Sequence, residues 1–241
     1  MMKLLVKICV LPLLLVFNLA VAAESDDIKA LRLVLAAKMP MAAEAVIKAT
    51  PIPGLYEVLA GANIMYTTKD ARYVLDGDLL DMVKRQNLTE ATRGIARTNA
   101  LDQLGEKNML VYKPEGDVKH TITVFTDIDC PYCRRLHQEM DQYMAAGVKV
   151  RYIFVPFKGK QSFDTSVSVW CAKDRNMSMD KAKSGEEIEA KTCDNPIEKH
   201  KQLASTLGIR GTPAIMLENG TLTPGYVPAE KMIKQMESLG L

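Results

Sequence analysis

Apolar and polar positions follow three successive patterns along the 241 residues of the chain. Residues 8–17 form a continuous apolar stretch that only Pro12 interrupts. One helical pattern and several short strand-like runs follow this stretch. From residue 109 onward, strand-like runs alternate with helical ones, which is typical of an α/β sheet. The patterns therefore predict a leader and two folded units of different class.

The first folded unit is predicted over residues 24–85. Its helix covers residues 25–37, where Ser25 can act as the N-cap and apolar side chains recur on one face. Strand-like runs then cover residues 55–60, 64–68, 73–75 and 79–83. A unit of roughly 60 residues is marginal alone, so we expect this α+β unit to gain stability by offering a strand edge to a second copy.

A mostly polar helix is predicted in the linker formed by residues 86–105. Thr89 is a suitable N-cap, and Gly105 can end the helix. Gly94 lies in the middle of the helix, where glycine costs about 1 kcal/mol relative to alanine. Because few of its positions are apolar, we expect the helix to connect two domains rather than to lie in a core.

The second folded unit, residues 106–241, carries the alternating pattern. Its strand-like runs cover residues 109–112, 121–126, 148–155, 214–217 and 221–223. Helical patterns cover residues 134–146 and the segment after Pro228. The Glu-Asn-Gly sequence between the last two strands is a hairpin signal. We therefore expect an α/β domain.

Charge and composition identify the leader and exclude one class of partner. Lys3 and Lys7 precede the apolar stretch and small residues follow it, which together predict a cleaved signal peptide over residues 1–23. A membrane anchor is the alternative, but the stretch is too short to span a bilayer comfortably. Without the two leader lysines, 29 basic residues balance 29 acidic ones. This balance gives no reason to expect nucleic acid as a partner.

Four cysteines remain once the leader, with its Cys9, is removed: Cys130, Cys133, Cys171 and Cys193. An even number in an exported chain suits an oxidising compartment and two disulfides. Of the three possible pairings, the C-x-x-C spacing favours Cys130 with Cys133, which leaves Cys171 with Cys193. A zinc site is the alternative, but it would need a second close pair, and the other two cysteines are 22 positions apart. We therefore expect no metal and no other cofactor.

The first cysteine of the motif lies where an anionic sulfur is favoured. Cys130 directly follows a predicted strand and opens a helix, so we expect an exposed thiol whose thiolate is stabilised by free N–H groups and the helix dipole. Cys133 lies one turn further on and can attack a mixed disulfide formed at Cys130. Pro131 fits the first helical turn. The carboxylates of Asp127 and Asp129 could relay a thiol proton, or could simply be solvated at the end of the strand.

Other candidate residues lie outside this motif. Thr212-Pro213 directly precedes an apolar strand, where a cis peptide bond and an ordinary trans turn are both open. The histidines His120, His137 and His200 are isolated in the sequence, and we interpret them as surface or packing residues.

Four motifs together closely resemble those of the DsbC/DsbG family, the bacterial periplasmic disulfide isomerases. They are the Phe-Thr-Asp-Ile-Asp-Cys-Pro-Tyr-Cys sequence at residues 125–133, and the segments 170–174, 211–214 and 219–226. The resemblance covers essentially the whole mature chain. It implies an N-terminal dimerisation domain, a linker helix and a thioredoxin-fold domain with a helical insert.

The resemblance also implies roles for individual residues. Cys130 would be the attacking cysteine and Cys133 the resolving one. Four residues would line the substrate groove: Pro131, Tyr132, Thr212 and a cis Pro213. Cys171 and Cys193 would form a structural disulfide in the insert.

By the same resemblance, the protein would be a V-shaped periplasmic homodimer with an apolar cleft. It would rearrange wrong disulfides in misfolded or misoxidised proteins, act as a chaperone, and be kept reduced by a membrane thiol reductase of the DsbD type. Pro131 gives the C-P-Y-C motif of DsbG-type enzymes rather than the C-G-Y-C of DsbC-type ones, whereas the pair Cys171 and Cys193 indicates DsbC. A DsbG-like reductase of oxidised single cysteines and a mainly chaperone-type binding protein are therefore the alternative functions.

Overall fold

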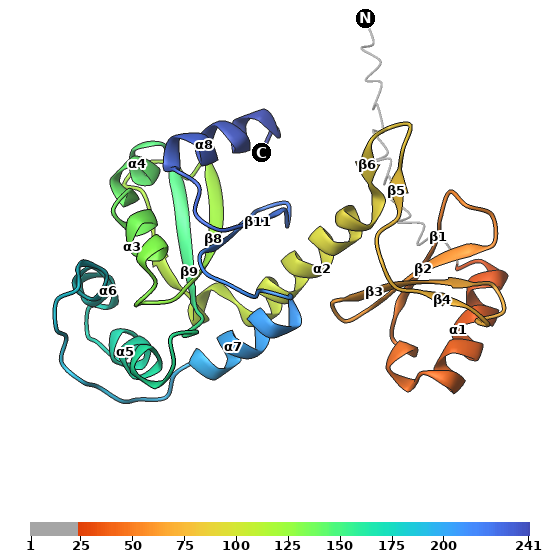
Figure 1. The fold of residues 1–241 in the computed structure, drawn as a ribbon, viewed down its shortest axis with the longest axis horizontal. Coiled ribbons are helices and arrows are strands. Elements are labelled where there is room, and N and C mark those ends of the chain that lie inside the picture. Colours follow the sequence, from red (N-terminus) through yellow and green to blue (C-terminus); the bar gives the residue numbers. More distant parts are fainter. Residues whose placement is uncertain (1–23) are drawn as a thin grey trace, which may run out of the picture.

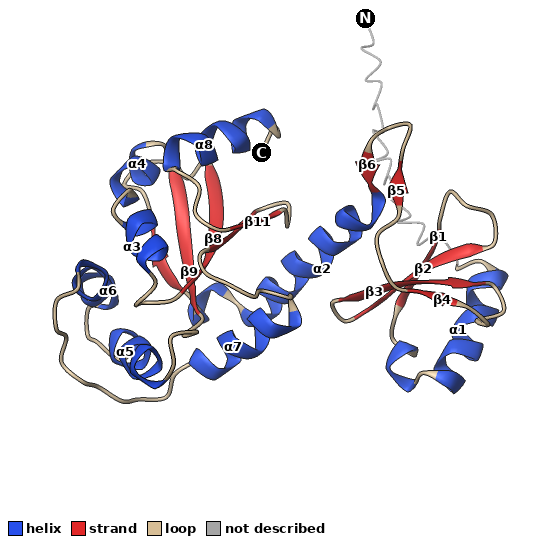
Figure 2. Cartoon of the chain, viewed as in Figure 1, coloured by secondary structure: helices blue, strands red, loops and turns tan. Residues whose placement is uncertain are grey.

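Two folded units lie at the two ends of a long helix, α2 (Leu88–Leu104), in the computed structural model of the protein (Figure 1). The structure describes residues 24–241, so the predicted signal peptide over residues 1–23 lies outside the described residues. Both units combine helices and strands, which confirms the predicted fold class (Figure 2). None of the helices within residues 24–241 combines the length and the apolar character that crossing a membrane requires.

The N-terminal unit packs one helix, α1 (Asp26–Lys38), on an antiparallel sheet in the order β1-β2-β3-β4. The strands are β1 (Val46–Ala49), β2 (Leu55–Ala60), β3 (Asn63–Thr68) and β4 (Val74–Leu75), and the turn η1 (Pro40–Ala42) leads into them. As predicted, Ser25 caps α1, since its hydroxyl accepts a hydrogen bond from the Ile28 amide. Leu31 and Leu35 are buried in the small core of this unit.

Two strands of the N-terminal unit differ from the sequence prediction. Strand β1 is absent from the prediction because only Ile47 of its four residues is buried, which leaves no alternating pattern. The run over residues 79–83 is a strand only at β5 (Leu80–Asp81), which pairs with β6 (Gln86–Asn87) in a separate ladder. The Asp81 carboxylate accepts hydrogen bonds from two amides that follow it, and so turns the chain after β5.

The N-cap of α2 is Asn87, so the prediction of Thr89 is wrong. The Asn87 side chain accepts a hydrogen bond from the Glu90 amide. Thr89 instead lies inside the first turn and is fully buried, where its hydroxyl bonds the Tyr66 hydroxyl and accepts from the Leu79 amide. Tertiary contacts with the N-terminal sheet therefore decide which of two suitable capping residues begins the helix.

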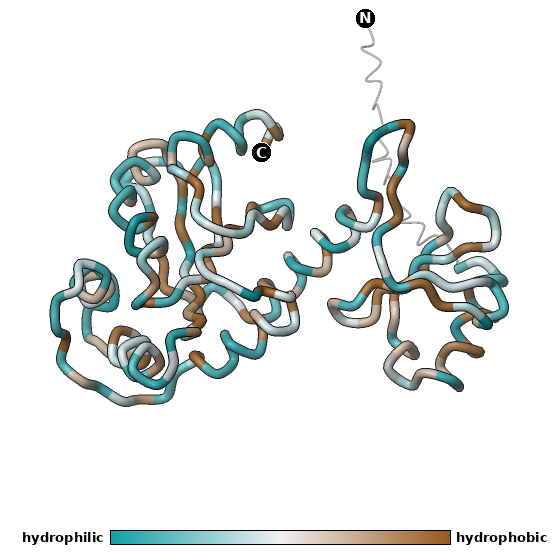
Figure 3. The backbone as a smooth tube through the Cα atoms, in the orientation of Figure 1, coloured by the Kyte–Doolittle hydropathy of each residue, from teal (hydrophilic) through white to brown (hydrophobic). Residues whose placement is uncertain are grey.

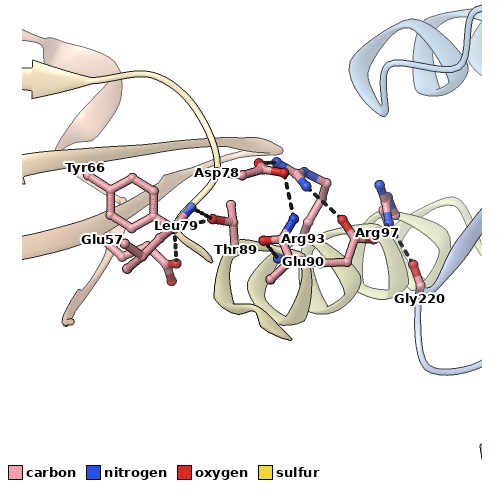
Figure 4. A network of polar contacts seen from close by, with 10 residues as sticks. Glu57, Tyr66, Asp78, Leu79, Thr89, Glu90, Arg93, Arg97 and Gly220 are labelled. Atoms are coloured by element: carbon pink, nitrogen blue, oxygen red, sulfur yellow. Dashed lines mark hydrogen bonds and ion pairs between the residues drawn. The ribbon is translucent and has the colours of Figure 1, made fainter. Parts of the chain in front are cut away.

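The second half of α2 packs against the C-terminal unit, although the helix is mostly polar (Figure 3). Arg97 is only 7 % exposed, pairs with Glu90 and donates to the Gly220 carbonyl oxygen at 3.1 Å. Figure 4 shows these contacts within a polar network that extends back to Tyr66 in the N-terminal sheet. The helix connects two domains as predicted, but the prediction that it lies outside a core is wrong, because Leu101 belongs to the C-terminal core.

Two glycines allow the backbone of α2 to touch the C-terminal unit. A Cβ atom on Gly94 would lie 2.8 Å from the Asn219 carbonyl oxygen, and one on Gly220 would lie 2.1 Å from the Gly94 carbonyl oxygen. Gly220 also has a φ of +81°, which side chains rarely adopt. The glycine that weakens the helix locally is thus required for docking.

The C-terminal unit is built on a five-stranded sheet in the order β11-β10-β8-β9-β7. After the turn η2 (Glu106–Asn108), its strands are β7 (Leu110–Tyr112), β8 (His120–Thr126), β9 (Val148–Phe154), β10 (Ala214–Leu217) and β11 (Leu222–Pro224). Strands β8 and β9 are parallel and the other neighbours are antiparallel. Val124 and Tyr152 belong to the core on one face of the sheet, and Phe125 and Ile153 to the core on the other.

Helices cover both faces of this sheet. They are α3 (Pro131–His137), α4 (Met140–Ala145), α5 (Lys160–Trp170), α6 (Arg175–Ser184), α7 (Ile197–Thr206) and α8 (Ala229–Ser238). The insert of α5, α6 and α7 lies between β9 and β10 in the sequence. The prediction of one helix over residues 134–146 is wrong, because the helix is interrupted at Gln138 and Glu139, between α3 and α4. The Glu139 carboxylate accepts hydrogen bonds from the Tyr226 hydroxyl and the Ala229 amide, which holds the break in place.

Replacing Gly94 by alanine tests the docking of α2. At an exposed helical position this change stabilises by about 1 kcal/mol. Here we expect Gly94→Ala to lower the free energy of unfolding by about 1–3 kcal/mol, because the new methyl group overpacks the contact with Asn219. Urea unfolding measures the effect. Asn99→Ala, at an exposed position of the same helix, is the control and should not destabilise; stabilisation by Gly94→Ala would contradict the docking.

Candidate active site

The C-x-x-C motif lies where β8 gives way to α3. After the last residue of β8 the chain makes a short turn and reaches Cys130, which is the N-cap of α3 and has an extended backbone. Pro131 occupies the first helical turn, as predicted. Cys130 and Cys133 are both free thiols. The expected exposure of Cys130 is wrong, because this residue is only 6 % exposed and Cys133 only 1 %.

Strand pairing brings the Thr212-Pro213 segment to the same place. The antiparallel register sets Ala214, the first residue of β10, opposite Phe125 near the end of β8. The chain just before β10 therefore lies beside the turn just after β8. The Cys130 thiol donates a hydrogen bond to the Thr212 carbonyl oxygen at 3.2 Å, across 82 positions of sequence. The Thr212–Pro213 peptide bond is cis, which is one of the two alternatives that the sequence leaves open.

The two thiols of the motif have unequal tendencies to ionise. Burial acts to raise the pKa of Cys130, but the Cys133 amide at the open end of α3 and the Thr212 side chain favour the thiolate and lower this pKa overall. The hydrogen bond from the Cys130 thiol to the Thr212 carbonyl oxygen stabilises the protonated form, but the hydrogen-bond donors have the larger effect on the pKa. Burial raises the pKa of Cys133, although the Lys183 ammonium and the Thr126 hydroxyl oppose this. Cys130 is therefore the sulfur more easily converted to the nucleophilic thiolate.

The two aspartates before the motif have different surroundings. Asp127 is fully buried, and its carboxylate accepts hydrogen bonds from the amides of Asp129 and Lys158 and from the Ser162 hydroxyl. It therefore ties the turn at the active site to the start of α5. Asp129 is half-buried and pairs with the Arg134 guanidinium at 3.1 Å. These contacts support a structural function for both carboxylates rather than a proton relay.

A buried lysine under the motif was not foreseen from the sequence. Lys183 on α6 is 3 % exposed, and its ammonium donates to the Thr126 hydroxyl at 2.9 Å and to the Asp127 carbonyl oxygen at 2.7 Å. The rest of α6 is strongly polar, so the lysine resembles a surface residue. The burial of Lys183 could have been inferred from its spacing along the helix, because Met179, Ala182 and Lys183 share the buried face of α6.

An aromatic pair borders the motif on the outside. Tyr132 is 60 % exposed and stacks on Tyr226, with ring centroids 6.5 Å apart. The Arg135 guanidinium lies 4.9 Å from the centre of the Tyr226 ring, and the Tyr226 hydroxyl donates to Glu139. Pro131 is also exposed, whereas Pro213 is buried. Of the predicted groove residues, Pro131 and Tyr132 thus form an open rim, and Thr212 and Pro213 lie deeper beside Cys130.

Two of the histidines, His200 and His137, are packing residues, which agrees with the interpretation of the histidines as surface or packing residues. The His200 ring nitrogens bond the Phe154 amide and the Asn108 carbonyl oxygen, and burial lowers its pKa to about 4. The His137 ring bonds the Tyr152 hydroxyl at 3.0 Å and the Asp180 carboxylate at 2.9 Å.

The remaining two cysteines lie in the insert. Cys171 at the end of α5 and Cys193 before α7 are joined by a disulfide, with their Cα atoms 5.7 Å apart. The bond closes a loop that contains α6 and therefore Lys183. The disulfide therefore restrains the segment of the insert that carries Lys183.

Alkylation of the reduced protein tests the inequality of the two thiols. The thiolate is the reactive form, so the alkylation rate rises with pH and reaches half of its maximum at the pKa. Because the pKa of Cys130 is lowered, the midpoint for Cys130 should fall below about 8.5, the ordinary value. Cys133 should stay unmodified over the same range. Iodoacetamide labelling followed by peptide mass spectrometry measures both, and a Cys130 midpoint at or above the ordinary value would contradict the geometry.

Comparison with known protein families identifies both units. Residues 19–90 match the family described as disulfide bond isomerase protein N-terminal domain, which is the dimerisation domain of DsbC proteins. Residues 106–240 match the thioredoxin-like domain family. Among solved structures, a linker-deletion mutant of Proteus mirabilis ScsC superimposes with a TM-score of 0.51 at 21% identity, over 64% of this chain and 88% of that one. This likeness supports the fold.

Relatives of known name cover most of the chain. The thiol:disulfide interchange protein DsbC of Salmonella typhimurium is 40% identical over 189 residues, which cover 77% of this chain and 78% of the relative. The DsbC protein of Escherichia coli (strain K12) is 38% identical over the same length and the same shares. Together with the two matched domains and the dithiol at the start of α3, these similarities show that the chain belongs to the DsbC family of thiol:disulfide interchange proteins.

Proposed function

We propose that the protein is a periplasmic disulfide isomerase in which Cys130 attacks and Cys133 resolves. The unequal ionisation of the two thiols carries this proposal. Cys130, with a lowered pKa at the start of α3, supplies the thiolate, and the more buried Cys133 is held as a thiol beneath it. A predicted signal peptide over residues 1–23 would deliver the enzyme to the periplasm, where substrates with wrong disulfides form.

The reaction begins with attack of the Cys130 thiolate on one sulfur of a substrate disulfide. A bond forms between Cys130 and that sulfur, the substrate disulfide breaks, and the other substrate sulfur leaves as a thiolate. In isomerisation, another substrate thiolate then attacks the mixed disulfide and restores the Cys130 thiolate, so no net electrons are transferred. If Cys133 attacks instead, the enzyme becomes oxidised and the substrate reduced. A membrane thiol reductase of the DsbD type would then return the enzyme to the dithiol form.

The surface around Cys130 suits an extended polypeptide. Pro131 and Tyr132 offer an exposed apolar rim, while Thr212 and the cis Pro213 lie close to the reactive sulfur. Misfolded and misoxidised proteins expose such segments, so we assign them as the substrates.

The dimer would form through the N-terminal domain. Strand β4 is at the end of the sheet order, so its outer edge has no strand partner within residues 24–241. Its residues Val74 and Leu75 and the preceding Tyr73 are between 51 % and 58 % exposed, although they are large and apolar. An exposed apolar strand edge favours pairing with a second copy. The two catalytic domains would then face one client, which stays close through repeated attacks.

One observation favours a second function. Pro131 gives the motif of DsbG-type enzymes, which supports activity as a reductase of oxidised single cysteines. Rates on a scrambled multi-disulfide protein and on a protein with one sulfenylated cysteine distinguish the two functions. A chaperone function would persist without any dithiol, so retention of aggregation suppression by Cys130→Ser separates binding from exchange.

Substitution of each cysteine tests the assigned roles. Cys130→Ser should reduce the refolding of a scrambled substrate to the uncatalysed rate, because no thiolate is left to attack. Cys133→Ser should retain the attack and accumulate mixed disulfides, which appear as higher bands on non-reducing gels. Full isomerase activity in Cys130→Ser would reject the mechanism, as would mixed disulfides that form equally well without Cys130.

Charge introduced at the β4 edge tests the dimer. Leu75→Lys should give a monomer in sedimentation, because a lysine on an open strand edge opposes pairing. Isomerase activity should fall by roughly tenfold or more, while reduction of a small disulfide stays unchanged. Val46→Lys changes a similarly exposed residue on β1, at the opposite edge of the same sheet, and should leave the dimer intact. A Leu75→Lys dimer, or a monomer with full isomerase activity, would contradict the proposed interface.

A further inference from the structure

Cys133 is buried too deeply to lose its proton directly to water. The residue is 1 % exposed, and burial raises the pKa of its thiol. Resolution of a mixed disulfide nevertheless requires the Cys133 thiolate, since the thiol itself is a poor nucleophile. The proton must therefore pass to a neighbouring group, and the structure offers one.

The Thr126 side chain connects Cys133 to the buried amine of Lys183. The Thr126 hydroxyl is positioned to donate to the Cys133 thiolate and accepts a hydrogen bond from the Lys183 Nζ atom at 2.9 Å. A second N–H of Lys183 donates to the Asp127 carbonyl oxygen at 2.7 Å, which fixes the position of the amine. Thr126 and Lys183 are 0 % and 3 % exposed. The three groups thus form a continuous path that is closed to solvent.

We propose that Lys183 takes up the proton of the Cys133 thiol, through the Thr126 hydroxyl, in the step that releases a substrate from Cys130. This inference rests on the proposed roles of the two cysteines and adds a positioning residue to them. Nothing in the C-x-x-C motif itself points to Lys183, which lies about fifty positions away on α6.

The surroundings of Lys183 suit a group that changes its charge. Burial is the main influence and lowers its pKa to about 8, while the Cys133 and Cys130 sulfurs and Asp127 act to raise it. A sulfur tied up in a mixed disulfide carries no charge, so formation of that intermediate removes one influence that keeps the lysine protonated. The neutral amine is thereby favoured at the stage when a proton acceptor is needed.

The charged and titratable groups that face Lys183 come from α3 and the turn before it: Asp127, Cys130, Cys133, Arg134 and His137. The nearby Arg134 guanidinium also acts to lower the pKa of the lysine. The other elements packed on α6 engage different residues of that helix. Tyr112 of β7 bonds Asp180, and Trp170 of α5 lies against the Arg175 guanidinium.

The proposed step conserves protons and electrons. The Cys133 proton moves to the Thr126 oxygen as the Thr126 proton moves to the neutral Lys183 amine, which leaves a thiolate and an ammonium. The Cys133 thiolate then attacks the Cys130 sulfur. The bond between the two enzyme sulfurs forms, the bond from Cys130 to the substrate breaks, and the substrate sulfur leaves with the electron pair. The two enzyme cysteines are oxidised and the substrate is reduced.

Ellman's reagent, an aromatic disulfide with a coloured leaving thiol, separates the two steps in one stopped-flow trace. Attack by Cys130 releases the first coloured thiolate, and attack by Cys133 releases the second. In Lys183→Met we expect the second release to be slowed by about tenfold or more near pH 7. The wild-type rate should be approached near pH 10, where a larger fraction of Cys133 is already ionised before the attack and a proton acceptor is needed less. The first release should change little.

Two further variants complete the experiment. Lys181→Met removes an exposed lysine from the same helix and should leave both releases unchanged. Thr126→Val keeps Lys183 but cuts the path, and should slow the second release with the same recovery at high pH; it also provides the test if Lys183→Met does not fold.

Several outcomes would overturn the inference. One is an unchanged second release in Lys183→Met, and another is slowing that is equal at every pH, which would indicate a packing defect. An unchanged profile in Thr126→Val would reject the path through the hydroxyl. A wild-type protein that lacks the first release would instead refute the proposed role of Cys130. Failure of the proposed function can therefore be distinguished from failure of the role inferred for Lys183.

Discussion

The antiparallel pairing of β8 with β10 is the contact on which the active site depends. Its register sets Ala214 opposite Phe125, so the turn that carries Cys130 and the segment that carries the cis Pro213 meet at one edge of the sheet. A shift of one residue would turn every side chain of the strand to the other face and separate the two segments. The fully buried Ile122, Val124 and Ile215 fill the core on one face of the sheet, which makes such a shift costly.

The same sheet places the sulfur atoms of Cys130 and Cys133 in different environments. Cys130 is at the free end of α3, where amide groups favour its thiolate, while Cys133 lies one turn deeper against the end of β8 and against α6. The insert therefore does more than enlarge the domain. The insert places Lys183 of α6 within hydrogen-bond distance of Thr126, beside the motif. The disulfide between Cys171 and Cys193 closes the loop that contains α6.

Helix α2 makes the two units of the chain interdependent. Its first turn is bound to the N-terminal sheet through Thr89, and its middle touches the β10–β11 turn through Gly94 and Arg97. Because neither Gly94 nor Gly220 carries a side chain, the backbone of the helix and the backbone of the turn come closer than two side chains would allow. The polar surface of the helix conceals this function, because several of its buried polar side chains bond partners on the two units: Thr89 bonds Tyr66, Thr92 bonds Glu57 and Arg97 bonds the Gly220 carbonyl oxygen.

Much of the fold and of the active site followed from the sequence by itself. Short strand-like runs identified β2, β3 and the strands of the C-terminal sheet. The spacing of Cys130 and Cys133 at the start of a helix indicated thiol chemistry. Both kinds of feature depend on neighbours along the chain. Only the tertiary structure decided the rest. Asn87 rather than Thr89 caps α2, the chain breaks at Glu139, and Lys183 is buried beneath Cys133. Each depends on a partner far away in the sequence, which local pattern and propensity do not contain.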